Sequence, residues 1–186
     1  MKRVIDVVGA SVLVLLLLPL MLGAAIAVRL SSSGPIFFRQ RRIGQYGREF
    51  EMLKFRTFPT DHVDRELALK LDECPLPVGR FLRRTSIDEL PQLFNVIKGQ
   101  MSLVGPRPER PHFAAPLSEE VPGYVDRLRL PVGITGLAQV HGLWGVGNIE
   151  ERVRYDNHYI DEWSLGLDFK ILLKTVPELF VKARVR

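Results

Sequence analysis

The sequence predicts an α+β protein in which an amino-terminal re-entrant membrane helix, kinked at a proline, precedes a small domain. Three observations support this fold class. Residues 4–28 carry a single charge, strand-like segments flank a turn-rich loop within residues 36–58, and amphipathic helical segments follow. We expect residues 1–30 to form the membrane helix. Residues 31–186 should form one domain with a β-hairpin, short strands and helices at the membrane surface.

The amino-terminal segment is long enough to cross a membrane but has a proline in its middle. As a helix, residues 4–28 would extend about 37 Å, and about 20 apolar residues span a bilayer. Pro19 removes a helical hydrogen bond, which hydrocarbon cannot replace. Basic residues flank both ends, so a helix that enters one leaflet, bends at Pro19 and returns satisfies the charge bias. A kinked spanning helix and a cleaved signal peptide are the alternatives.

The soluble part begins with a predicted β-hairpin. Residues 36–42 and 50–58 flank the loop GQYGR, and the second strand places Lys54 and Arg56 on one face. After the hairpin, residues 61–71 are interpreted as a short polar helix or loop. Residues 76–84 are predicted to form another short helix that ends in two arginines.

The stretch RRTSIDELPQLFNVIKGQMSLVGPRPE, residues 83–109, contains two adjacent acids. Ser86 and Glu89 have the spacing of a capping box, and Thr85 with Asp88 offers a second register. The proline that follows is tolerated only near a helix start, and apolar periodicity then continues. The acids therefore have a sufficient structural interpretation as caps of an amphipathic helix.

Arginines surround these acids. Arg83 precedes them, and Arg107 follows between two prolines that restrict its backbone. An arginine held in this way can grip a phosphate bidentately, although a stiff connector with a solvated arginine is the alternative. Cations, a helix start and paired carboxylates together suit a diphosphate with a metal. One carboxylate could attack phosphorus while Mg²⁺ neutralises charge on the phosphate oxygens.

Three further segments complete the domain. Residues 133–142 are interpreted as a glycine loop leading into a short strand, with a plain turn as the simpler role of the glycines. Residues 149–163 predict a helix whose many charges form a solvated face. Residues 168–186 predict a basic amphipathic helix that either lies on a membrane surface or packs on the core.

Five segments of the chain carry a family resemblance: KRVIDVVGA (2–10), KFRT (54–57), TSIDELPQLFNVIKGQMSLVGPRPE (85–109), GITGLAQV (133–140) and YDNHYIDEWSLGLDFKILLKT (155–175). Together they resemble the bacterial sugar transferases and, more narrowly, the small monotopic phosphoglycosyl transferases. The resemblance extends almost end to end, and the combination of DELPQ with GPRP is its most specific part.

This resemblance implies a reaction and a site. A sugar phosphate passes from a UDP-sugar to polyprenol (undecaprenyl) phosphate with Mg²⁺, and UMP is released, as the first membrane step of glycoconjugate assembly. Asp88 is implied as the nucleophile of a ping-pong mechanism, Glu89 as its acidic partner, and both as metal ligands. The implied phosphate contacts are Lys54, Arg56, Arg83 and Arg107. Because UDP-sugars are cytosolic, the site should lie on the cytoplasmic face of the bacterial inner membrane.

The chain also departs from the family pattern. Pro131-Val132 stand where many relatives have Arg-Pro, and residues 141–144 replace a common Asn-Gly-arginine pattern. These changes leave the identity of the sugar open, and Arg127 or Arg129 is a candidate replacement for the missing charge.

The net charge of +5 and pI of about 9.6 favour anionic partners, and no nucleic-acid-binding module is recognisable. Membrane lipid is an expected partner, and so are downstream glycosyltransferases. An inactive membrane-surface scaffold, or a protein that only binds polyprenol phosphate, is the alternative function.

Overall fold

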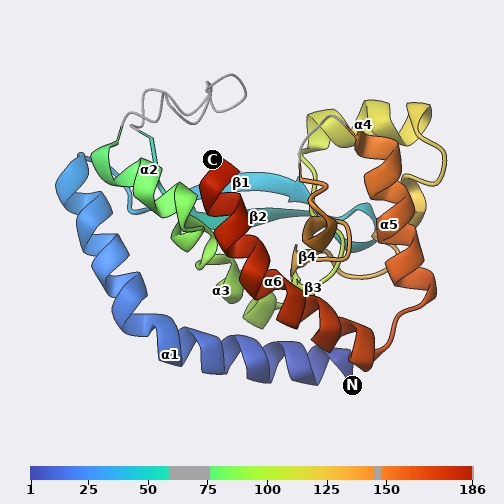
Figure 1. The fold of residues 1–186 in the computed structure, drawn as a ribbon. Helices are drawn as coiled ribbons and strands as arrows, with labels where there is room; N and C mark the ends of the chain where they lie inside the picture. Colours follow the sequence, from blue (N-terminus) through green and yellow to red (C-terminus); the bar gives the residue numbers. More distant parts are fainter. Residues whose placement is uncertain (59–75, 145–147, 186) are drawn as a thin grey trace.

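The computed structural model describes residues 1–58, 76–144 and 148–185, and it confirms the α+β class (Figure 1). The predicted segment 61–71 lies outside the described residues. Short 3₁₀ turns connect several of the elements, and one of them, η4, carries the two acids. In chain order the helices and strands are α1 (Lys2–Ser31), β1 (Phe37–Ile43), β2 (Glu49–Phe55), α2 (Pro77–Arg84), α3 (Gln92–Lys98), β3 (Ser102–Val104), α4 (Pro111–Glu120), β4 (Gly133–Thr135), α5 (Ile149–Asp161) and α6 (Leu165–Val185).

Helix α1 is continuous through Pro19 and bends partway along its length (Figure 1). In the described part of the chain it is the one helix long and apolar enough to cross a membrane, and only 17% of its most apolar window is buried. Leu15 and Leu16 are each 71% exposed. An apolar surface of this extent on a protein marks a contact with lipid or a partner. Helix α1 is therefore the part of the described chain that would insert into a membrane.

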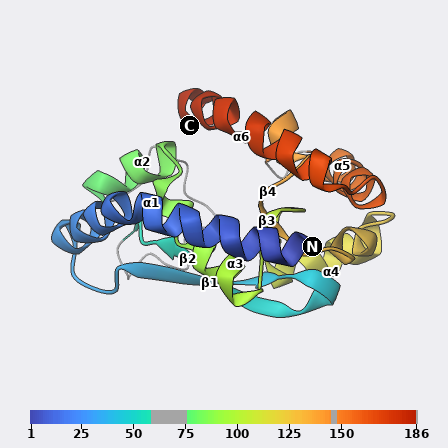
Figure 2. The same cartoon turned by 90° about the horizontal axis from the view of Figure 1, so that it is seen from below.

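Polar contacts join the start of α1 to the domain. Lys2 forms an ion pair with Asp168 of α6 (2.7 Å), and Arg3 donates to the last carbonyls of α3. Asp6, the one charge within the apolar segment, accepts hydrogen bonds from the Ser102 hydroxyl (2.9 Å) and from the next backbone N–H. Seen from below, α1 passes across α3 and the hairpin (Figure 2). The charges at this end therefore fix the helix to the domain.

The predicted hairpin is confirmed, and α3 is pinned to it. Strands β1 and β2 pair antiparallel, and Phe50 and Met52 of β2 are buried in the core. The side chain of Asn95 on α3 accepts from the Leu53 N–H (2.9 Å) and donates to the Glu51 carbonyl (2.7 Å). These bonds hold α3 against β2. The turn that carries the two acids directly precedes α3, so it is held near β2 as well.

The second sheet consists of β3 and β4, which pair parallel with Ser102 opposite Gly133. The predicted order of this region is wrong, because β4 is formed by Gly133–Thr135 itself and a 3₁₀ turn follows it. A Cβ on Gly133 would lie 2.1 Å from the Gly105 nitrogen, and one on Gly136 would lie 2.2 Å from the Gly105 oxygen. The glycines therefore permit close packing of two backbone segments.

Helix α6 has one face that packs on the core and another face with exposed apolar side chains. Ile171 is buried in the core, while Phe169, Leu173 and Val176 are each more than half exposed. Its carboxyl end lies beside α2 in both views (Figures 1 and 2). One face of α6 thus packs on the domain, and another leaves apolar side chains exposed.

Candidate active site

The two acids lie in the 3₁₀ turn η4 (Ile87–Glu89), between α2 and α3. Both side chains are buried, with Asp88 7% and Glu89 9% exposed. The predicted capping box is wrong. Ser86 adopts a left-handed conformation with φ of 58° and makes no side-chain cap bond, and the Thr85 hydroxyl donates back to the Phe81 carbonyl. The acids therefore do not serve as caps, and α3 begins after them at Gln92.

A cavity of about 160 Å³ opens beside the acids and is rich in cations. Lys54 Nζ lies 3.2 Å from Glu89 Oε1, and Arg107 Nη2 lies 3.7 Å from the same oxygen. The structure thus brings Lys54, Arg107 and both predicted acids together. The charged residues that line the cavity are Arg42, Lys54, Arg56, Arg83, Arg107, Arg110, Asp88 and Glu89, a surplus of four positive charges.

The predicted arginines Arg56 and Arg83 differ in what they bind. The Arg56 guanidinium donates to the Pro35 carbonyl and to the backbone and hydroxyl oxygens of Ser32. Burial, together with the nearby Arg29, lowers the pKa of Arg56. Arg56 therefore ties the connection between α1 and β1 to the cavity wall.

Arg83 instead lies over the ring of Phe58, with 4.9 Å from its guanidinium carbon to the ring centre. Its Nη1 is buried and makes no hydrogen bond within the described residues. Phe38 and Phe58 line the same cavity. This arrangement leaves guanidinium donors and aromatic rings beside the two acids.

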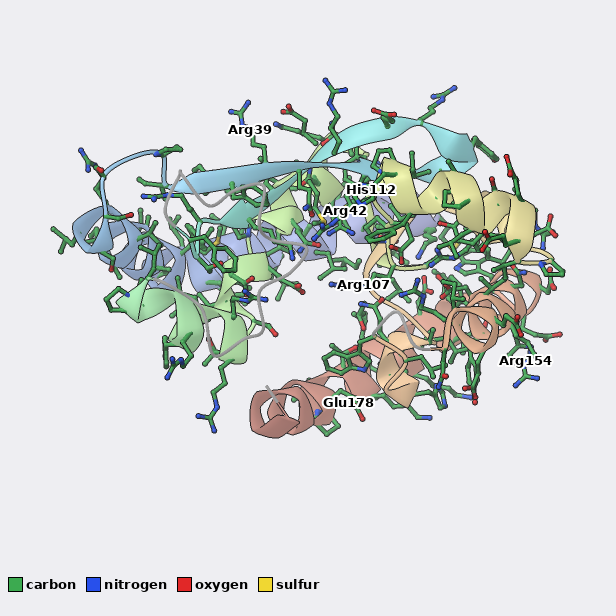
Figure 3. All side chains as sticks on the ribbon, turned by 90° about the horizontal axis from the view of Figure 1, so that it is seen from above. Arg39, Arg42, Arg107, His112, Arg154 and Glu178 are labelled. Atoms are coloured by element: carbon green, nitrogen blue, oxygen red, sulfur yellow. The ribbon has the colours of Figure 1, made fainter. Side chains whose placement is uncertain are left out.

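The backbone that carries Arg107 is held from several sides. The Gly133 N–H donates to the Pro106 carbonyl (2.9 Å), Arg127 donates to the Arg107 carbonyl (2.9 Å) and Arg42 donates to the Pro108 carbonyl (3.0 Å). The segment is thus stiff, and its arginine lines the cavity instead of being solvated as in the alternative interpretation. Figure 3 shows Arg107 in the space between the hairpin and α6.

A buried cluster of charges supports this segment from behind. Arg127 donates twice to Asp156 Oδ2, at 2.6 and 3.0 Å, and Arg152 forms an ion pair with Glu109. The prediction that the charges of residues 149–163 form a solvated face is wrong for Arg152 and Asp156, which are buried. Arg127 is fully buried, so it is also not a replacement for a substrate-contacting charge. Arg152 and Asp156 differ from surface charges because each pairs with a residue far away in the sequence, Glu109 and Arg127 respectively.

A second cavity, of about 390 Å³, adjoins the first and is mostly apolar. Leu13, Leu17 and Leu20 of α1 form one wall, and α6 contributes to another. Glu89 and Arg107 line both cavities. Figure 3 shows Glu178 on the α6 side of this space. Trp144, from the segment that departs from the family pattern, also lines the apolar cavity.

The donor set for a metal consists of two carboxylates. Among the described residues no group of three or more His, Cys, Asp or Glu side chains could hold a metal ion. Mg²⁺ is commonly bound by one or two carboxylates together with substrate phosphates. Asp88 and Glu89 fit that pattern when a diphosphate is present.

An exposed apolar helix, a cation-rich cavity with two acids and an adjoining apolar cavity are the features of a membrane-associated transferase. The chain belongs to the bacterial sugar transferase family, whose sequence model matches residues 1–182.

Several relatives whose names state an activity are similar over nearly the whole chain. The UDP-glucose:undecaprenyl-phosphate glucose-1-phosphate transferase of Caulobacter vibrioides is 48% identical over 96% of this chain and 69% of its own length. The Escherichia coli protein of the same name is 42% identical over 97% of this chain and 40% of its own length. The UDP-N-acetylgalactosamine-undecaprenyl-phosphate N-acetylgalactosaminephosphotransferase of Aeromonas hydrophila is 39% identical over 94% of this chain and 42% of its own length. The relatives thus differ in the sugar they carry.

Proposed function

We propose that this protein transfers a sugar-1-phosphate from a UDP-sugar to undecaprenyl phosphate and releases UMP. The observation that carries this proposal is that Glu89 and Arg107 line both cavities. A polar donor and a lipid acceptor can therefore present their phosphates to the same two side chains. The names of the relatives support the choice of substrates, and UDP-glucose is the first donor to test.

The cation-rich cavity suits the UDP-sugar. Lys54, Arg83 and Arg107 provide charged donors for the diphosphate, and guanidinium groups bind phosphate oxygens in pairs. Phe38 and Phe58 offer flat surfaces for the uracil ring. The surplus of positive charge attracts a dianionic ligand before any specific contact forms.

The two-step chemistry uses Asp88 as the nucleophile. An Asp88 carboxylate oxygen bonds to the sugar-bearing phosphorus, the bond from that phosphorus to the bridging oxygen breaks, and UMP leaves with the electron pair. A phosphate oxygen of undecaprenyl phosphate then bonds to the same phosphorus, and the Asp88–phosphorus bond breaks. The carboxylate is regenerated and undecaprenyl-diphosphate-sugar is released.

Glu89 is placed to organise this site. Lys54 and Arg107 hold its Oε1, which orients the carboxylate between the two cavities. We propose that Asp88 and Glu89 hold Mg²⁺ together with the donor phosphates. When bound, the ion would neutralise charge on the phosphate oxygens.

The apolar cavity suits the first isoprene units of the acceptor. Its wall from α1 continues into the exposed apolar surface of that helix, so a lipid can enter from the bilayer. We propose that α1 is re-entrant, with its bend inside one leaflet and the site on the cytoplasmic face. A tag at Met1 that reacts only from the periplasm would contradict this topology.

The test is UMP release from UDP-glucose with Mg²⁺ and undecaprenyl phosphate in detergent. The wild-type protein should release UMP continuously, and without acceptor it should release about one UMP per chain and gain the mass of one phosphosugar. Asp88→Asn should abolish both signals, whereas Asp126→Asn, at an exposed position, should retain them. Full activity of Asp88→Asn would contradict the covalent mechanism. Binding of undecaprenyl phosphate without UMP release from any UDP-sugar would favour the binding-protein alternative.

A further inference from the structure

Ser86 has a backbone conformation that serine rarely adopts. Its φ of 58° lies in the left-handed region, and of the described residues other than glycine only Tyr46 shares this property. A side chain at such a position is unfavourable relative to glycine, and strained residues concentrate at functional sites. Ser86 immediately precedes the turn that carries the acids. The turn geometry alone would be met more easily by glycine.

The hydroxyl of Ser86 is also poorly satisfied. Its Oγ is buried and has no hydrogen-bond partner among the described residues. The neighbouring Thr85 differs, because its hydroxyl donates to the Phe81 carbonyl at 2.8 Å. A buried hydroxyl without a partner is unfavourable, so such a group calls for a ligand or a water. Strain and an unsatisfied donor thus coincide at one residue.

The position of Ser86 indicates which substrate it meets. Ser86 lines the apolar cavity but not the cation-rich one, whereas Asp88 lines the cation-rich cavity but not the apolar one. Arg107 reaches both. A lipid phosphate entering along the apolar cavity therefore approaches Asp88 past Ser86 and Arg107. These two side chains offer it a neutral donor and a charged donor.

Resting on the function proposed above, we propose that the Ser86 hydroxyl donates a hydrogen bond to the phosphate of the incoming undecaprenyl phosphate. The bond positions the acceptor for attack on the phosphosugar held by Asp88. Ser86 acts in the second half of the reaction, and its proton stays on its own oxygen. The first half, which releases UMP from the donor, does not use this contact.

The experiment compares Ser86→Ala with Ser86→Gly in the full chain. Both variants remove the hydroxyl, but glycine also removes the backbone strain, so it is the variant expected to fold without difficulty. With UDP-glucose alone, both should keep the wild-type burst of UMP and the phosphosugar mass adduct. In turnover, both should raise the KM for undecaprenyl phosphate roughly tenfold or more, as expected for a lost bond to a charged group. Ser118→Ala, whose hydroxyl is exposed and bonded within α4, is the matched control.

Each other outcome is informative. Recovery of the acceptor KM in Ser86→Gly but not in Ser86→Ala would assign the effect to the backbone and overturn the proposal. An unchanged acceptor KM in both variants would also overturn it. Loss of the UMP burst in both variants would overturn it too, because it would show that Ser86 acts on the UDP-sugar. Absence of a burst from the wild-type protein with every UDP-sugar would instead refute the proposed function itself.

Discussion

Two clusters of charged side chains lie on either side of the GPRP segment, residues 105–108, and they differ in whether their positive and negative charges are equal in number. Behind the segment, Arg127 and Arg152 meet Asp156 and Glu109, so positive and negative charges are equal in number. In front of it, six cations line a cavity with only two carboxylates. Behind the segment Arg127 Nη2 lies 2.6 Å from Asp156 Oδ2, whereas in front of it Lys54 Nζ lies 3.2 Å from Glu89 Oε1. Balance marks a structural cluster, and surplus charge marks a binding site.

The physical reason is the environment of each cluster. A buried charge without a partner is strongly unfavourable, so a cluster closed to solvent must match its charges within the protein. In the site cluster, Arg107 keeps part of its hydration, and the buried Arg56 is compensated by carbonyl and hydroxyl oxygens, so a surplus is tolerated. That surplus becomes favourable when an anion binds. On the function proposed above, a phosphate would complete the site cluster, whereas the structural cluster is completed by the chain itself.

The largest expected effect comes from breaking the balanced cluster. Arg127→Met leaves Asp156 buried without its partner and should lower the free energy of unfolding by about 3–5 kcal/mol. Chemical denaturation in detergent measures this change. The double variant Arg127→Met/Asp156→Leu should recover much of the loss, because it removes both charges. A double variant no more stable than the single one would show that pairing is not what the cluster supplies.

A cation of the site cluster should behave in the opposite way. Arg83→Gln should lower the free energy of unfolding by no more than about 1 kcal/mol, the usual size of a cation–π contact such as the one it makes with Phe58. It should lower kcat/KM for the UDP-sugar roughly 10- to 100-fold, because a charged contact to phosphate is lost. UMP release over a range of donor concentrations measures the second effect. Arg154→Gln, on the exposed side of α5, is the control, and an equal loss there would show that only the overall charge matters.

The sequence predicted the local elements of this fold and the location of its acids. Turn formers between alternating strands identified the hairpin, and apolar periodicity ending at a glycine identified α3. The charges were harder to assign, because their partners are far away in the chain. Arg127 and Asp156 are 29 residues apart, and Lys54 and Glu89 are 35 apart. Helix and strand periodicity relates only residues a few positions apart in the sequence. It therefore cannot distinguish a charge in a buried ion pair from a charge on a solvated helix face.

The same limit explains the capping box. Ser86 and Glu89 have the correct spacing, but spacing does not reveal that the backbone turns left-handed at Ser86. The prediction of a glycine loop at Gly133 and Gly136 was wrong for a related reason. Their packing partner, Gly105, lies 28 residues before Gly133, and backbone contact over that distance leaves no periodic signal. Resemblance to the family supplied the predicted assignment of Asp88 as nucleophile, whereas the local pattern left open which of the two acids would act.

A third cluster consists of Lys2, Tyr159 and Asp168 at the start of α1, and its effect on stability should depend on pH. Tyr159 donates to Asp168 at 2.6 Å, and burial together with this carboxylate raises the pKa of the Tyr159 phenol. Its folded pKa lies above its unfolded value near 10, so its stabilisation is present below pH 10 and is lost as the pH rises further. Tyr159→Phe should reduce stability at pH 8 by about 1 kcal/mol and should flatten the alkaline decline. Lys2 is paired with the same carboxylate in both proteins, so the difference between wild type and variant isolates the phenol.

The smallest effect is expected at a pair that is balanced but exposed. Arg39 and Glu51 lie 3.5 Å apart on the hairpin, with their side chains 67% and 58% exposed. Water already solvates both charges, so Arg39→Ala should change the free energy of unfolding by no more than about 0.5 kcal/mol and should leave UMP release unchanged. A double-mutant cycle with Glu51→Ala measures the coupling directly. A coupling as large as that of Arg127 with Asp156 would mean that charge matching stabilises this protein regardless of burial. Balance would then no longer separate its structural cluster from its site.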